Sequence, residues 1–154
     1  MKYFLILLLL PTLLTSLSVH AGDVVYQSGT EQAVLVELYT SEGCSSCPPA
    51  DRWLSQLLNH PALWEKVVPV AFHVDYWNYL GWDDRFSRSA FTVRQRIYKK
   101  EGGLSGVYTP GVLVAGQEWR NWRQTKPDFV VESPEVGELV VRVEQGEFST
   151  SFTN

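Results

Sequence analysis

Apolar residues along this chain fall into short runs and helix-spaced sets, and polar loops separate them. Three of the runs are rich in valine and leucine, which is typical of buried strands in a mostly parallel sheet. They predict strands over residues 33–39, 66–74 and 112–115. A turn at Gly116-Gln117 is expected to lead into a fourth strand over 118–122.

Two segments repeat their apolar residues at the spacing of a helix. The first follows Pro48, which suits a first helical turn because a missing N–H costs little there, and it ends at Pro61. The second is expected to be capped by Asp83 or Asp84 and to end at a pair of glycines. Its predicted apolar face consists of Phe86, Ala90, Val93 and Ile97.

The two ends of the chain differ from this middle part. Residues 1–21 contain a charged start, an apolar run and a small-residue cleavage site, which together indicate a secretory signal peptide. The run is too short to cross a bilayer, so we expect no stable membrane span after cleavage. Residues 22–32 predict a loose lead-in to a domain over 22–125. Alternating apolar residues in 126–154 predict a β-hairpin tail that turns at Gln145-Gly146.

Composition and charge narrow the possible functions. The chain has 154 residues and is 45% hydrophobic, which is typical of a globular domain and argues against disorder. Its formal net charge is −4, and the charge becomes one unit more negative when the segment containing Lys2 is removed. The basic residues form no stripe, so nucleic acid is not an expected partner. Export predicts a periplasmic or secreted protein in an oxidising compartment.

The only two cysteines of the chain, Cys44 and Cys47, lie between the first predicted strand and the first predicted helix. Strand, Cys-x-x-Cys and helix, in this order, form the layout of a thioredoxin-like redox site. The helix start is expected to surround the motif with free backbone N–H groups, which favour a reactive thiolate. A bridge between the cysteines closes so short a loop that chain entropy assigns it only about 2 kcal/mol. A chemical role therefore explains the presence of the two cysteines better than a stabilising role does.

On this interpretation Cys44 is the nucleophile, and Cys47 resolves the mixed disulfide formed with a partner, without a cofactor. The predicted fold is thioredoxin-like α/β with an enlarged middle helical insertion and a short C-terminal hairpin. The usual closing helix is not predicted, because prolines interrupt residues 124–136. Three alternatives stay open: an inert disulfide, a metal carrier or metallochaperone that uses both cysteines with or without His73, and an adaptor that presents the aromatic loop over 75–82.

Three separated phrases of the sequence resemble one family of secreted bacterial proteins. They are ELYTSEGCSSCPPAD at 37–51, HVDYWNYLGW at 73–82 and VYTP at 107–110. The family is known as domain of unknown function 1223, and the resemblance covers about residues 33–122. It implies a thioredoxin-like fold and a thiol–disulfide oxidoreductase that acts on protein thiols and disulfides and has an unidentified redox partner. Its members usually continue into a longer β-rich C-terminal region, of which this chain carries the start.

The same resemblance implies roles for three residues. Pro110 corresponds to a cis proline that faces the cysteines, and Thr109 before it offers its backbone to an extended partner peptide. Glu37 corresponds to the buried acid that takes the proton of the resolving cysteine in thioredoxin. A solvent-facing or salt-bridged glutamate is an equal alternative for Glu37.

The end of the second predicted strand carries the remaining candidates. His73 and Asp75 can act as an acid–base or orienting pair, although a hydrogen-bonded pair that fixes the loop is the favoured interpretation. Trp77 and the other aromatic residues of the 75–82 loop can form an apolar shelf for a protein partner, or a small core of the loop itself.

Overall fold

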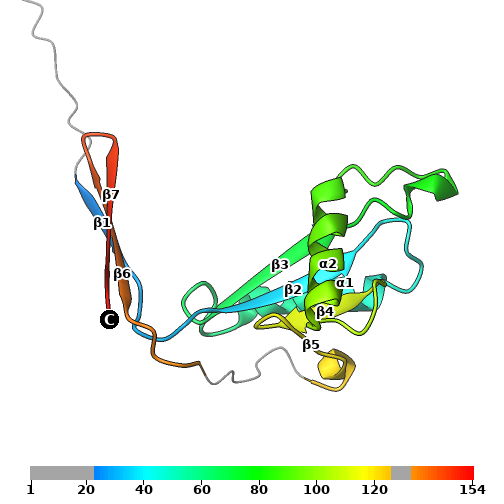
Figure 1. Cartoon of the computed structure of the whole chain (residues 1–154), viewed down its shortest axis with the longest axis horizontal. Helices are drawn as coiled ribbons and strands as arrows, with labels where there is room; N and C mark the ends of the chain where they lie inside the picture. The colour runs from blue at the N-terminus through cyan, green and yellow to red at the C-terminus, as the bar shows by residue number, and fades with distance from the viewer. Residues whose placement is uncertain (1–22, 126–132) are drawn as a thin grey trace, which may run out of the picture.

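The computed structural model describes residues 23–125 and 133–154. Within these ranges the chain is a mixed α/β structure with two α-helices and two β-sheets (Figure 1). One sheet has the strand order β3-β2-β4-β5 and the other has the order β1-β6-β7. The elements are β1 (Val24–Gln27), β2 (Val34–Thr40), α1 (Pro48–Gln56), the 3₁₀ turn η1 (Leu57–Asn59), β3 (Val67–His73), η2 (Asn78–Leu80), α2 (Ser89–Glu101), β4 (Gly111–Val114), β5 (Gln117–Glu118), η3 (Asn121–Arg123), β6 (Glu138–Glu144) and β7 (Glu147–Thr153).

Strand β2 forms the centre of the four-stranded sheet. It pairs in parallel with β3 and antiparallel with β4. The three strands predicted from valine- and leucine-rich runs are confirmed, and each of their bounds is shifted by one residue. Pro69 lies inside β3, where its missing N–H is tolerated because β3 is an edge strand.

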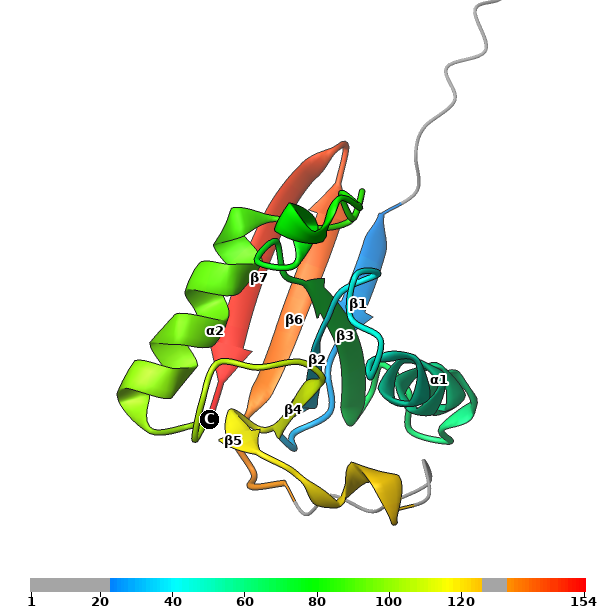
Figure 2. The ribbon, with the colours of Figure 1, turned by 90° about the vertical axis from the view of Figure 1, so that its right-hand side faces the viewer.

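The two helices cover opposite faces of this sheet (Figure 2). Alternate residues of β2, including Val36 and Leu38, pack with α1 in one core cluster. The residues between them point to the other face, where Tyr39 packs with Leu113 and with Tyr98 of α2. The cysteine motif follows the last residue of β2 and precedes α1.

Helix α2 differs from its prediction in both its start and its buried face. It begins at Ser89, after Arg88 as the N-cap, and not at Asp83 or Asp84. Its buried side chains are Thr92 and Gln95. The residues of the predicted apolar face are largely exposed, with Phe86 at 50%, Val93 at 51% and Ile97 at 48%. The prediction was wrong because the buried side chains of this helix are polar and hydrogen-bond to the loops after β3 and before β4.

The predicted fourth strand is shorter than expected. The turn lies at Ala115-Gly116, both with positive φ, and β5 contains only Gln117 and Glu118. The chain then bends into η3, where Trp122 is 6% exposed. Burial of this large side chain against the α1 face of the sheet replaces continuation of the strand.

The ends of the described chain form a second sheet. The predicted β6–β7 hairpin is confirmed, and its turn residues Gln145 and Gly146 both have positive φ, as a tight two-residue turn requires. Residues 24–27, predicted as a loose lead-in, instead form β1 and pair with β6. This correction has a physical reason, since a third strand supplies the support that a lone hairpin lacks.

Some predictions fall outside the described residues. They are the signal peptide over 1–21 and most of the segment over 124–136 for which no closing helix was expected. In the ranges that the structure covers, no helix is both long and apolar enough to cross a membrane.

Candidate functional site

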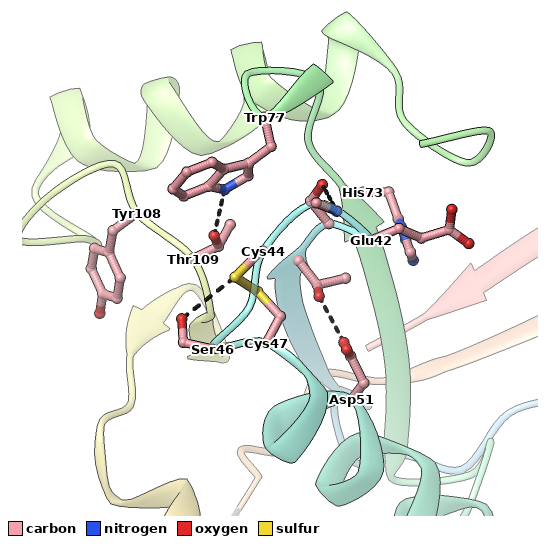
Figure 3. The surroundings of a disulfide bond; sticks show 12 residues. Glu42, Cys44, Ser46, Cys47, Asp51, His73, Trp77, Tyr108 and Thr109 are labelled. Atoms are coloured by element: carbon pink, nitrogen blue, oxygen red, sulfur yellow. Dashed lines mark hydrogen bonds between the residues drawn. A yellow bond between two sulfur atoms is a disulfide. The ribbon is translucent and has the colours of Figure 1, made fainter. Parts of the chain in front are cut away.

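A disulfide joins Cys44 and Cys47 where β2 passes into α1 (Figure 3). Their Cα atoms lie 5.4 Å apart. Two backbone hydrogen bonds shape the loop, from Cys44 N–H to the Ser41 carbonyl and from Cys47 N–H to the Cys44 carbonyl. Cys44 is the more exposed of the two, as expected of an attacking cysteine, but it is only 4% exposed and Cys47 is fully buried.

The helix start offers fewer free donors to the disulfide than predicted. Pro48 and Pro49 occupy the first turn and carry no N–H. The N–H groups of Ala50 and Asp51 both donate to the Cys47 carbonyl. The backbone of this turn therefore has no unused N–H for a thiolate, although the helix dipole remains.

A side chain supplies the polar contact that the backbone does not. The Ser46 hydroxyl lies 3.5 Å from the Cys44 sulfur, and because a disulfide sulfur has no proton, the hydroxyl is the donor (Figure 3). Ser45 is exposed and points to no such partner among the described residues. The two serines of the motif thus have different environments.

Trp77 of the aromatic loop lies close to the cysteine motif. The Trp77 indole N–H donates to the Thr109 hydroxyl at 2.8 Å, above Cys44 in the view of Figure 3. Trp77 also packs on the residue that precedes Cys44, because a Cβ on Gly43 would meet the Trp77 Cβ at 3.2 Å. The Thr109-Pro110 peptide bond is cis. These contacts hold the segment before Pro110 next to the motif.

Glu37 is fully buried on the α2 face of β2. Its carboxylate accepts two hydrogen bonds from the Arg94 guanidinium, at 2.9 and 3.0 Å, and one each from the Tyr39 and Tyr98 hydroxyls. Burial, together with this neighbouring carboxylate, raises the pKa of Tyr39. Glu37 is therefore buried, as the resemblance implies, and it is also salt-bridged, as the alternative interpretation states.

A different acid lies beside the cysteines. Asp51 stands one helical turn after Cys47, and its carboxylate accepts a 2.7 Å hydrogen bond from Thr40 at the end of β2 (Figure 3). Thr40 points to the α1 face of the sheet, opposite to Glu37. Asp51 was not among the predicted site residues, although its spacing of four residues from Cys47 places both on one helix face.

His73 and Asp75 do not pair with each other. The His73 ring contacts the buried Asp84 carboxylate at 2.6 Å, and Asp75 instead accepts from Thr92 of α2. Burial alone would raise the pKa of Asp84, but hydrogen bonds from the Glu42 N–H, the His73 ring and a further backbone N–H hold it below its ordinary value. Asp84 therefore ties the loop before Cys44 to the end of β3. Among the described residues, no three His, Cys, Asp or Glu side chains gather as a metal site would require.

The segment that leads to Pro110 is anchored by Glu118 of β5. The Glu118 carboxylate accepts hydrogen bonds from the Tyr108 hydroxyl, the Ser105 N–H and hydroxyl, and the Arg120 guanidinium. Burial alone would raise the pKa of Glu118, but these hydrogen-bond donors lower it to about 2. Burial and the contact with Glu118 raise the pKa of Tyr108 to about 12.

The fold and site thus define a mixed α/β protein with a Cys-x-x-Cys disulfide between a central strand and a helix. The chain belongs to the family described as protein of unknown function, DUF1223, whose family model matches residues 35–144. No curated protein matches it. A crystal structure of a protein from Agrobacterium tumefaciens is 44% identical over 55% of this chain and 37% of that chain, with a TM-score of 0.46. This chain thus spans well under half the length of that protein.

Proposed function

We propose that this chain is an exported thiol–disulfide oxidoreductase that acts on protein thiols and disulfides. The observation that carries the proposal is the Cys44–Cys47 disulfide at the junction of β2 and α1, beside the Thr109-Pro110 segment. A disulfide that closes so small a ring adds little stability, so we assign it a role in thiol–disulfide exchange. We further propose that residues 22–125 are a thioredoxin-like domain, that 126–154 are a tail, and that residues 1–21 direct the chain to the periplasm or the exterior.

The reaction begins when a thiolate of a partner dithiol attacks the Cys44 sulfur. The Cys44–Cys47 bond breaks, a mixed disulfide forms on Cys44, and Cys47 leaves as a thiolate that takes up a proton. The second thiol of the partner then attacks the mixed disulfide and releases Cys44. The partner is oxidised to a disulfide by two electrons, and the chain becomes a dithiol that an unidentified redox partner reoxidises.

Two residues assist these steps. The Ser46 hydroxyl, already 3.5 Å from the Cys44 sulfur, stabilises the Cys44 thiolate when it leaves. Asp51, one turn from Cys47, exchanges the proton of the buried thiol. We assign Glu37 a structural role, since all of its hydrogen-bond partners are residues of β2 and α2.

The proposal is tested in the reverse direction, by exchange of the reduced chain with a peptide disulfide, followed by mass spectrometry. Cys44→Ser is expected to abolish exchange, and Cys47→Ser is expected to accumulate a mixed disulfide on Cys44. Ser45→Ala, a change in the same loop at an exposed residue, serves as the control and should exchange normally. Unchanged exchange in Cys44→Ser would refute the proposal.

A further inference from the structure

A cavity of about 420 Å³ lies beside the cysteine motif. It is lined by Ser46 of the motif and by the Tyr108-Thr109-Pro110 segment, together with Val112, Trp119, Arg120, Trp122 and Arg123. In Figure 3, Ser46, Tyr108 and Thr109 lie on the same side of the disulfide. The cavity is therefore next to the place where a partner peptide would lie, if the chain exchanges disulfides as proposed above.

The floor of the cavity is aromatic and well supported. Trp122 is 6% exposed, and its ring centroid lies 6.2 Å from that of Trp53 of α1. Trp119 packs edge-on against the same Trp53 ring, with centroids 5.5 Å apart. Both tryptophans also line the cavity. The floor is therefore held by the core cluster of α1 and provides a preformed surface.

The charged side chains that line the cavity are both cations. Arg120 donates to Glu118 and to Ser105, which fixes the position of its guanidinium. Arg123 stacks on the Trp122 ring, with 4.7 Å between the guanidinium carbon and the ring centroid. Within residues 23–125 and 133–154, no carboxylate pairs with Arg123. In the part of this acidic chain that the structure describes, a guanidinium without a carboxylate partner thus lies beside the cysteine motif.

We propose that this cavity binds an aspartate or glutamate side chain that lies one or two residues from the reactive cysteine of a protein partner. An extended peptide advances about 3.3 Å per residue, so a neighbouring side chain reaches the cavity while the cysteine faces Cys44. The planar guanidinium of Arg123 matches a carboxylate with two parallel hydrogen bonds. The methylene groups of the acidic side chain pack on the tryptophan rings of the floor. This inference rests on the proposed exchange function.

The test measures the binding of short peptides to the oxidised full chain by calorimetry. The peptides carry serine in place of cysteine, so no exchange occurs, and glutamate or glutamine at each of the two positions on either side. The best glutamate peptide is expected to bind about fivefold more tightly than its glutamine counterpart. Added salt should reduce this preference because an exposed ion pair is screened.

Two variants locate the effect. Arg123→Gln is expected to remove the preference for glutamate. Arg142→Gln makes the same charge change at an exposed position of β6 in the other sheet, and it should keep the preference. Equal affinity for glutamate and glutamine peptides, no measurable binding of any peptide, or loss of the preference in Arg142→Gln would each overturn the inference.

The exchange assay separates this inference from the proposed function. If the wild-type chain exchanges with peptide disulfides but shows no preference for acidic peptides, the cavity assignment fails and the exchange function stands. If acidic peptides bind through Arg123 but no peptide disulfide is exchanged, the binding site stands and the exchange function fails.

Discussion

Removal of the charge on Glu118 is expected to change how the stability of the chain depends on pH. Its carboxylate accepts hydrogen bonds from Tyr108, Ser105 and Arg120, and these outweigh burial to bring its pKa from 4.5 to about 2. Since the pKa is lower in the folded chain, the ionised carboxylate stabilises the fold. This stabilisation is complete above pH 4.5 and is lost as the pH falls toward 2.

The size of the effect follows from the difference between the two pKa values. At about 1.4 kcal/mol per pH unit, a change from 4.5 to about 2 corresponds to roughly 3 kcal/mol. This is an upper limit, because the Arg120 side chain is 68% exposed and solvent weakens its contribution. Glu118→Gln should therefore lower the free energy of unfolding at pH 7 by up to about 3 kcal/mol, and the deficit should shrink as the pH falls.

The measurement is urea unfolding of the wild type and Glu118→Gln at several values between pH 7 and pH 2.5, followed by tryptophan fluorescence. Other carboxyl groups titrate in the same range, so the difference between the two proteins is the informative quantity. Glu65→Gln is the control, because Glu65 is exposed and its carboxylate has no hydrogen-bond or ion-pair partner in the described part of the chain. A difference between wild type and Glu118→Gln that stays constant from pH 5 to pH 2.5 would refute the reasoning.

Three further predictions follow from the contacts of the site. Ser46→Ala should lower the reduction potential of the cysteine pair by about 20 mV, because one hydrogen bond to the Cys44 thiolate is worth ~1 kcal/mol. Ser45→Ala should leave the potential unchanged. Equal potentials of Ser46→Ala and the wild type in glutathione buffers would contradict this prediction. Arg94→Met should lower the free energy of unfolding in urea by about 3 kcal/mol, because it leaves the buried Glu37 carboxylate without its cation. A loss below ~1 kcal/mol would argue against a stabilising role of this ion pair. Thr109→Val removes the hydrogen bond that the Trp77 indole donates, so dithiothreitol should reduce the Cys44–Cys47 disulfide about five times faster. Thr109→Ser keeps the hydroxyl and should keep the wild-type rate of reduction. No acceleration in Thr109→Val would show that this hydrogen bond does not limit access to the disulfide.

The sequence predicted the features that depend on neighbours along the chain. The run before Thr40 reads as a buried strand, the Pro-Pro pair reads as a helix start, and the two cysteines stand between them. The hairpin turn at Gln145-Gly146 is likewise local, since it depends on two residues that accept positive φ. Periodicity and turn chemistry are properties of short segments, so they can be identified without knowledge of the fold.

Only the tertiary structure decided which distant groups meet. Glu37 pairs with Arg94, which is 57 residues away, and His73 pairs with Asp84, although Asp75 is closer in sequence. Helix α2 shows the same limit, because its buried polar side chains find their partners in the loops after β3 and before β4. Strand β1 was missed because its pairing with β6 joins opposite ends of the chain. A local pattern reports which residues tend to be buried, but the partner of a buried polar group depends on which elements the fold brings together.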